Sequence, residues 1–189
     1  MTDKRSKIIL INGASSAGKS TLAKAFQALV DEPFLHFSLD LLMFGGAVLP
    51  VRRDTVGPFS WASMRPMLFD GYYRCLAALA SAGNNLVVDY IIETPDQLDR
   101  LVYLLTPFDV FYVCLYCPLS ELEQRERQRG DRRIGDAHRD HELVNRFGPY
   151  DAELDGMLSA DANAASLVAA WRARHSLGVF AARATDHVE

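Results

Sequence analysis

The sequence contains little cysteine and no long apolar stretch. Among 189 residues there are three cysteines, an odd number that gives no disulfide framework and suits a reducing compartment. No stretch approaches the roughly 20 apolar residues that a membrane-spanning helix needs. The first apolar run, over 8–11, is too short for the core of a signal peptide. We therefore expect a cytoplasmic protein without a membrane partner.

The sequence also lacks an excess of positive charge. It has 20 Lys and Arg residues against 24 Asp and Glu residues, which gives a net charge of −4. A protein whose main partner is a nucleic acid usually carries a basic footprint, so we do not expect a nucleic-acid partner. No internal repeat, low-complexity segment or linker is present. We predict a single domain over residues 1–189, and the sequence does not indicate an oligomeric state.

Residues 13–20 read Gly-Ala-Ser-Ser-Ala-Gly-Lys-Ser and match the phosphate-binding pattern G-x-x-x-x-G-K-[ST]. The two glycines let the backbone turn tightly and direct its N–H groups inward, which forms a concavity for anions. Lys19 can reach the outer phosphates of a nucleotide, and the hydroxyl of Ser20 can bind Mg²⁺. The pattern predicts ATP and Mg²⁺ as ligands. The predicted nucleotide-binding residues of this loop are Gly13, Ala14, Ser15, Ser16, Ala17, Gly18, Lys19, Ser20 and Thr21.

The residues on either side of this loop support the prediction. Residues 7–12 form a short apolar run rich in β-branched side chains, which is typical of a central parallel strand. Downstream, Leu22, Phe26 and Leu29 recur at helical spacing. The alternative is an ordinary tight turn between a strand and a helix. The order of strand, glycine loop and helix favours nucleotide binding.

Strands and helices alternate along the chain. We expect strands over 7–12, 34–39, 85–92, 109–116 and 150–154, and helices over 18–31, 61–79, 95–105, 118–129 and 161–175. An aperiodic loop separates the second strand from the second helix, and the tail after His175 carries no readable signal. This alternation predicts an α/β fold with a five-stranded parallel sheet and helices on both faces. Ligands of such sheets gather at the carboxyl ends of the strands.

One aspartate follows a predicted strand, and another lies near the end of one. Asp40 could accept a hydrogen bond from a substrate hydroxyl and align it for in-line attack, but it precedes a short apolar segment and could equally be a helix N-cap. Asp89 ends the apolar run that begins at Leu86, which is typical of a carboxylate that reaches Mg²⁺. Neighbouring loop amides could instead satisfy it. We favour Ser20 and Asp89 as the metal-binding pair, and we interpret His36, in the second strand, as a core residue.

Five arginines lie within nine residues, at positions 125, 127, 129, 132 and 133. Arginine is planar and permanently charged, so it is well suited to clamping a transferring phosphate. Arg125 follows Glu121 by four residues, so part of this cluster fits an ordinary ion pair on a helix surface. Arg129, Arg132 and Arg133 do not follow an acidic residue by four positions in the sequence. They are candidates for a lid over about 125–147.

Four segments resemble the chloramphenicol phosphotransferase-like proteins. These are the loop Asn12–Ser20 with its distinctive Ser-Ser-Ala-Gly-Lys, the strand that ends in Asp40, the stretch Arg127-Gln-Arg-Gly-Asp-Arg132, and Tyr150-Asp-Ala-Glu-Leu-Asp155. They follow in matching order over about 7–173. The resemblance implies a three-layer P-loop kinase fold with a short arginine-rich lid. It also implies an ATP-dependent kinase that phosphorylates a hydroxyl of a small molecule, with antibiotic resistance as the role of the type member.

The resemblance further implies that Asp40 is the catalytic aspartate and that Arg129 and Arg132 belong to the lid. In the resulting interpretation Lys19 bridges the phosphates, Arg129 and Arg132 neutralise developing charge, and Arg133 joins Arg129 at the nucleotide. A nucleotide-sensing protein without turnover is the alternative from a different functional class. Whether ATP or GTP is used stays open.

The predicted acceptor-binding loop, about 43–61, does not match the drug-binding stretch of the family. Loops of this kind determine substrate choice. The acceptor could therefore be chloramphenicol, another antibiotic or a metabolite. Arg52 and Arg53 could recognise an anionic acceptor, but we favour plain surface charges.

Overall fold

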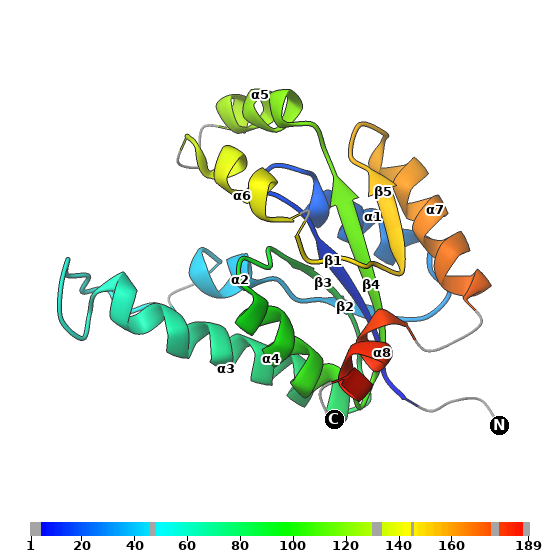
Figure 1. Ribbon diagram of the computed structural model, residues 1–189, viewed down its shortest axis with the longest axis horizontal. Helices are drawn as coiled ribbons and strands as arrows, with labels where there is room; N and C mark the ends of the chain where they lie inside the picture. Colours follow the sequence, from blue (N-terminus) through cyan, green and yellow to red (C-terminus); the bar gives the residue numbers. More distant parts are fainter. Residues whose placement is uncertain (1–4, 46–47, 130–133, 145, 175–177, 187–189) are drawn as a thin grey trace.

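The computed structural model describes residues 5–45, 48–129, 134–144, 146–174 and 178–186. At its centre is a five-stranded sheet in the order β2-β3-β1-β4-β5, in which every neighbouring pair is parallel (Figure 1). The strands are β1 (Lys7–Asn12), β2 (Phe34–His36), β3 (Asn85–Tyr90), β4 (Asp109–Tyr116) and β5 (Ala152–Asp155). The predicted five-stranded parallel sheet is confirmed.

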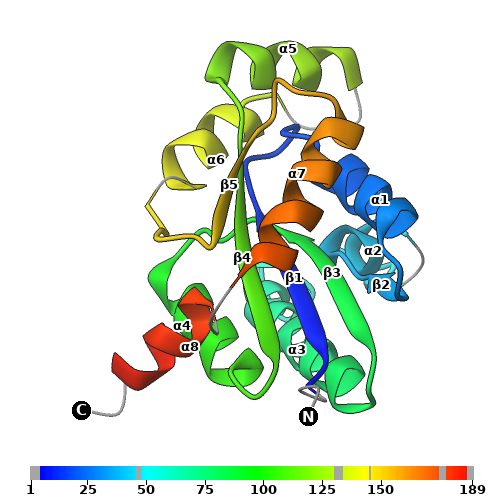
Figure 2. The same cartoon turned by 90° about the vertical axis from the view of Figure 1, so that its right-hand side faces the viewer.

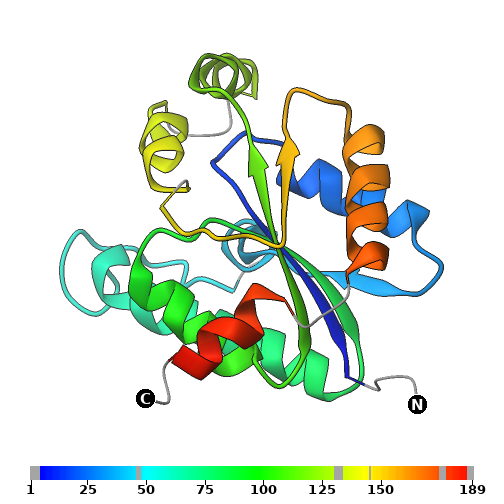
Figure 3. The same ribbon diagram turned by 45° about the vertical axis from the view of Figure 1, so that its right-hand side comes forward.

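Helices cover both faces of this sheet, as predicted (Figures 2 and 3). In β1, Ile9 and Ile11 join the apolar cluster beneath α1 (Lys19–Leu29) and α7 (Ala160–Ala173). Ile8 and Leu10 join the opposite cluster, because successive side chains of a strand point to opposite faces. That second cluster lies beneath α3 (Trp61–Ser81), α4 (Pro95–Leu105) and α8 (Val179–Asp186).

Three further helices lie at the carboxyl end of the sheet. They are α2 (Leu39–Met43), α5 (Leu119–Arg129) and α6 (Asp136–Val144); in Figure 1, α5 lies above the tip of the β4 arrow and α6 lies beside it. The loop between β1 and α1 opens toward the same end (Figure 3). The strand order and these helices therefore bring the predicted phosphate loop and lid region to one edge of the molecule, where ligands of parallel sheets bind.

Helix α2 corrects two expectations about the second strand. β2 ends at His36 rather than at residue 39, because Ser38 begins a new helix by accepting a hydrogen bond from the Leu41 amide. Asp40 is therefore not an N-cap. It lies in the first turn of α2, where a negative charge is favoured by the helix dipole.

The tail, which carries no readable signal in the sequence, forms helix α8. The Asp151 carboxylate accepts hydrogen bonds from the Val179 amide (2.9 Å) and the Tyr112 amide (2.7 Å), and so ties the start of α8 to β4. Phe180 is 1% exposed and packs against the Tyr112 ring. Within the described part of the chain, no helix combines the length and apolarity needed to cross a membrane.

Candidate active site

The phosphate loop joins β1 to α1 at the carboxyl end of the central strand. Gly18 is the N-cap of α1 and has a φ of 99°, a left-handed conformation that favours glycine. A Cβ on Gly13 would lie 2.8 Å from the Leu115 carbonyl oxygen, so a side chain there would force the loop away from β4. Ser16 has a φ of 65°, which is uncommon for a residue with a side chain. Such backbone strain is often stored at functional sites.

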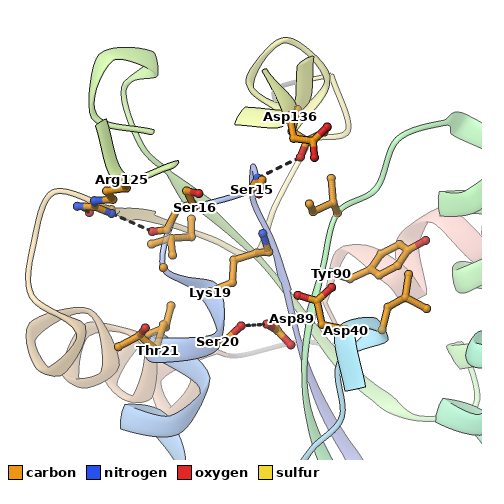
Figure 4. A pocket seen from close by; sticks show the side chains of 18 of the residues that line it. Ser15, Ser16, Lys19, Ser20, Thr21, Asp40, Asp89, Tyr90, Arg125 and Asp136 are labelled. Atoms are coloured by element: carbon orange, nitrogen blue, oxygen red, sulfur yellow. Dashed lines mark hydrogen bonds between the residues drawn. The ribbon is translucent and has the colours of Figure 1, made fainter. Parts of the chain in front are cut away.

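Lys19 is held at the mouth of this loop. Its ammonium donates to the carbonyl oxygens of Gly13 (2.8 Å) and Ala14 (2.7 Å), and the residue is 9% exposed. These contacts keep the positive charge at the phosphate loop, where Lys19 is labelled in Figure 4. Lys19, Ser20 and Thr21 line a cavity of about 1290 Å³. The structure thus brings together most of the predicted nucleotide-binding residues; Gly13 and Ala14 form the base of the loop.

Asp89, at the end of β3, lies directly opposite Ser20. Its Oδ2 accepts a hydrogen bond from the Ser20 hydroxyl, and its Oδ1 lies 2.8 Å from His36 Nε2. Burial alone raises the pKa of Asp89, but the hydrogen bonds from His36 and Ser20 outweigh it and hold the pKa below its ordinary value. Asp89 is therefore a carboxylate at neutral pH. The Asp89 carboxylate is thus hydrogen-bonded by two side chains, rather than by neighbouring loop amides as in the alternative interpretation.

Asp40 projects from the first turn of α2 into the same cavity (Figure 4). The phosphate loop and apolar residues, among them Phe44, Trp61 and Phe69, line this cavity together with Asp40. Ser38, which caps α2, and the register of β2 against β3 together set the direction from which this carboxylate enters. The structure therefore brings Asp40 and Lys19 into one pocket with the Ser20–Asp89 pair.

The arginines of the predicted lid have different surroundings. Arg125 pairs with Glu121 (2.7 Å), as the spacing predicts, but it also donates to the carbonyl oxygens of Ala17 (3.3 Å) and Gly156 (2.9 Å). It is thus attached to the phosphate loop, a role that the surface-pair interpretation missed. Arg129 lines the cavity from the end of α5. Arg132 and Arg133 lie outside the described residues.

Helix α6 forms a wall that the sequence prediction did not identify. Asp136, Arg139 and Asp140 all line the cavity. Asp140 is 0% exposed, and its carboxylate accepts a hydrogen bond from the Ser15 amide (3.2 Å). Burial raises the pKa of Asp140, against the lowering effect of Arg139 and Ser15. The signal in the sequence was weak, because an Asp-x-x-Arg-Asp pattern is also typical of an exposed helix face.

The opposite wall is aromatic. Trp61, Phe69 and Tyr90 line the cavity and meet edge to face, with ring centroids 6.2 and 6.4 Å apart. Arg65 lies over the Phe69 ring at 4.4 Å and pairs with Glu93, so both charges in this wall have a partner. Aromatic faces with a few placed polar groups are typical of small-molecule pockets.

The predicted acceptor loop contributes its two ends to the cavity. Met43 and Phe44 line it from one end, and Trp61 lines it from the other. Among the residues that the structure describes, neither Arg52 nor Arg53 belongs to the lining. Arg52 pairs with Asp54 (2.8 Å) and lies over the Phe59 ring, with 69% of its side chain exposed. This arrangement agrees with a surface charge.

The family model described as chloramphenicol phosphotransferase-like protein matches residues 6–172. The chain belongs to this family. Two Mycobacterium tuberculosis proteins, from strains CDC 1551 and H37Rv, are named for an inferred O-phosphotransferase activity. Each is 31% identical over 169 residues, which cover 79% of this chain and 74% of the relative.

Solved structures show the fold. The M. tuberculosis APS kinase CysC, in complex with AMPPNP and APS, superposes with a TM-score of 0.67 at 20% identity, over 89% of this chain and 99% of that one. A Deinococcus radiodurans tunicamycin resistance protein superposes with a TM-score of 0.61 at 19% identity, over 87% and 94%. This member of the chloramphenicol phosphotransferase-like family therefore has the three-layer P-loop kinase fold, as predicted.

Proposed function

We propose that this protein is an ATP-dependent phosphotransferase that moves the γ-phosphoryl group of ATP to a hydroxyl of a small molecule. The observation that carries the proposal is that Asp40 lines the same cavity as the phosphate loop and Lys19. Membership of a phosphotransferase family supports the reaction class. AMPPNP in the complex of the similar APS kinase supports an adenine nucleotide as donor.

In this proposal the loop amides and Lys19 hold the phosphates, and Asp40 orients the acceptor hydroxyl for in-line attack. The chain's own residues fit Mg²⁺, because Ser20 and Asp89 present a hydroxyl and a carboxylate, the oxygen ligands that this ion prefers. Mg²⁺ bound with the nucleotide would neutralise phosphate charge. Mg²⁺ in such sites is held by one or two protein groups plus phosphates, so a larger protein ligand set is not required.

We further propose that Arg129, Arg132 and Arg133 contact the phosphates from the lid, with Arg129 and Arg132 acting on the charge that develops during transfer. Arg125 is better suited to fixing the loop, since two of its nitrogens bind backbone carbonyls. The three free cysteines and the requirement for ATP support a cytoplasmic location.

The acceptor is proposed as a small molecule, an antibiotic such as chloramphenicol or a metabolite. The aromatic wall opposite the phosphate loop supports this size and chemistry. Solved structures of the same fold include an APS kinase and a tunicamycin resistance protein, so the fold accommodates diverse functions. The wall itself does not select one acceptor.

The test of the proposal is Asp40→Asn, which removes the carboxylate charge and keeps the side-chain shape. We expect acceptor-stimulated ADP release, measured over a panel of hydroxyl-bearing compounds, to fall by about 10²–10⁴-fold. Nucleotide affinity should stay within about threefold, because Asp40 does not belong to the loop that holds the phosphates.

Asp96→Asn is the matched control. Asp96 is also the second residue of a helix, α4, but it is exposed and does not belong to the cavity lining. It should behave as the wild type. Loss of nucleotide binding in Asp40→Asn would show a structural role for Asp40. Tight nucleotide binding without stimulation by any acceptor would favour a nucleotide sensor over a kinase.

A further inference from the structure

Asp140 is a fully buried carboxylate beside the phosphate loop, and the proposed function does not use it. Its Oδ2 accepts from the Ser15 amide at 3.2 Å. Its Oδ1 accepts from Arg139 Nε at 2.9 Å and Arg139 Nη2 at 2.7 Å. A buried charge is costly unless it is paired and hydrogen-bonded. Both oxygens of Asp140 meet this requirement with groups that line the cavity.

The helix that carries Asp140 is fixed at both ends by other contacts. At its start, the buried Glu126 carboxylate accepts from the amides of Gly135 and Ala137, each at 2.9 Å. At its end, the Val144 carbonyl accepts from the Tyr150 hydroxyl at 2.6 Å. The Tyr150 hydroxyl also accepts from the Asn12 side chain, one residue before the phosphate loop. Asp140 is thus presented to the loop by a helix whose position does not depend on the Ser15 contact.

Arg139 depends on Asp140 for its orientation. Two of its three nitrogens donate to Asp140, and its Nη1 lies 3.2 Å from Asp136, three residues earlier on the same helix. About half of the Arg139 side chain is exposed to the cavity and solvent. Without Asp140, the ion pair with Asp136 would draw the guanidinium along the helix and away from Ser15.

Building on the proposed function, we propose that Asp140 is a positioning residue that holds the Arg139 guanidinium at the mouth of the phosphate loop, where Arg139 contacts the outermost phosphate of a nucleoside triphosphate. Asp140 fixes the Ser15 amide with one oxygen and the guanidinium with the other. A guanidinium has five N–H donors, so Arg139 keeps donors for a phosphate after Asp140 is bound. A fixed guanidinium suits a terminal phosphate, which carries more exposed oxygens than an inner one.

The opposite role for Asp140 is competition with phosphate. A carboxylate bound to a loop amide would then have to leave before nucleotide binds, and its removal would tighten binding. The two roles predict changes of opposite sign. If Asp140 acts through Arg139, removing the negative charge weakens triphosphate binding, although Coulomb's law alone would strengthen it.

The experiment is equilibrium binding of ADP and of a non-hydrolysable ATP analogue, with Mg²⁺, to the wild type, Asp140→Asn, Arg139→Gln and the double variant. We expect each single variant to bind the analogue about tenfold more weakly and ADP within about twofold of the wild type. The double variant should be no weaker than either single variant, because both remove one guanidinium contact. Glu142→Gln is the matched control, since it also neutralises an acidic residue of α6 but is 63% exposed beside His138.

Four outcomes would overturn the inference. These are tighter analogue binding by Asp140→Asn, equal losses for ADP and the analogue, additive losses in the double variant, and variants that match the wild type. Arg139→Gln keeps the test valid if Asp140→Asn lowers the melting temperature, because Arg139 is half exposed and its replacement leaves the core intact. A wild type that binds neither nucleotide would refute the proposed function as well. If the wild type binds both, the variants test the role of Asp140 alone, and the proposed function is not affected by their result.

Discussion

At the scale of single residues, the charge of Asp89 is maintained by two neighbours from different elements. The Ser20 hydroxyl comes from α1, and His36 comes from the end of β2. Together their hydrogen bonds overcome the effect of burial on the pKa of this carboxylate. His36 occupies Oδ1 and thereby fixes the orientation in which Oδ2 faces Ser20. Partners of this kind orient the groups that bind metals.

We therefore expect His36→Ala to raise the Mg²⁺ concentration needed for half-maximal nucleotide binding by about tenfold, because second-layer partners typically contribute 10–100-fold. The measurement is nucleotide titration at a series of Mg²⁺ concentrations. His138→Ala, on the exposed face of α6, serves as the control and should leave the curve unchanged. An unchanged curve for His36→Ala would mean that Ser20 alone orients Asp89.

Sequence reasoning located the residues whose spacing is local and missed those whose partners are distant. Lys19 and Ser20 were predicted from an eight-residue motif. Asp40 was predicted from its place after a strand, and Asp89 from its place near the end of one. His36 was interpreted as a core residue because its partner lies 53 positions away. The contact between Asp140 and Ser15 spans 125 positions, and no periodicity in the sequence encodes it.

At the scale of elements, α6 depends on a carboxylate from another helix. A helix leaves its first amides without partners, and Glu126 of α5 satisfies those of Gly135 and Ala137. Burial raises the pKa of Glu126, but these backbone donors outweigh it and hold the pKa below its ordinary value. Folding therefore favours the ionised form of Glu126.

The lowered pKa of Glu126 makes the stability of the fold depend on pH. A lowered pKa stabilises the fold at pH values above the unfolded-state pKa, and this contribution is lost as the pH falls through the folded-state pKa. We expect Glu126→Gln to lower the free energy of unfolding by about 1–3 kcal/mol at pH 7, the range for hydrogen bonds to charged groups. The difference should shrink below about pH 4.5, the ordinary value for glutamate.

Urea unfolding of both proteins from pH 3 to pH 7 measures this difference. Glu123→Gln is the control, because Glu123 lies on the same helix and faces the exposed His138 at 3.7 Å. A gap between the wild type and Glu126→Gln that stayed constant down to pH 3 would show that shape rather than charge holds α6.

The elements that sequence reasoning found are those with continuous patterns. The buried strands β1, β3 and β4 read as apolar runs because both of their faces are covered. Helix α2 has five residues, too few to show a period, and its start depends on Ser38. Helix α8 has a single deeply buried side chain, and its position depends on Asp151, so its own sequence carries little signal.

At the scale of the whole molecule, the site and the tail lie at different ends of the sheet. The cavity is at the carboxyl end of the strands, and α8 packs against α4 and β4 lower on one face (Figure 1). Gly178, just before α8, allows the chain to approach Asp151 so closely that a Cβ there would lie 2.5 Å from Oδ2. The tail therefore completes one of the two apolar clusters without adding a described residue to the cavity lining.

This separation predicts that stability and nucleotide binding can be changed independently. Phe180→Ala removes the largest buried side chain of α8 and leaves a cavity against Tyr112, which should cost about 3–5 kcal/mol. For a domain of this size the melting temperature should fall by about 2–4 °C for each kcal/mol. Below the transition, nucleotide affinity should match the wild type, because α8 contributes no residue to the cavity lining among the described residues.

Tyr103→Ala, on the neighbouring helix α4, removes an aromatic side chain that is 73% exposed and should change the free energy of unfolding by less than about 1 kcal/mol. Differential scanning calorimetry together with nucleotide titration measures both quantities on the same samples. If Phe180→Ala weakened nucleotide binding at temperatures where the protein is folded, the sheet would transmit strain from the tail through β4 to the phosphate loop. Since Gly13 lies against the Leu115 carbonyl of β4, a shift of that strand would be felt first at the base of the loop.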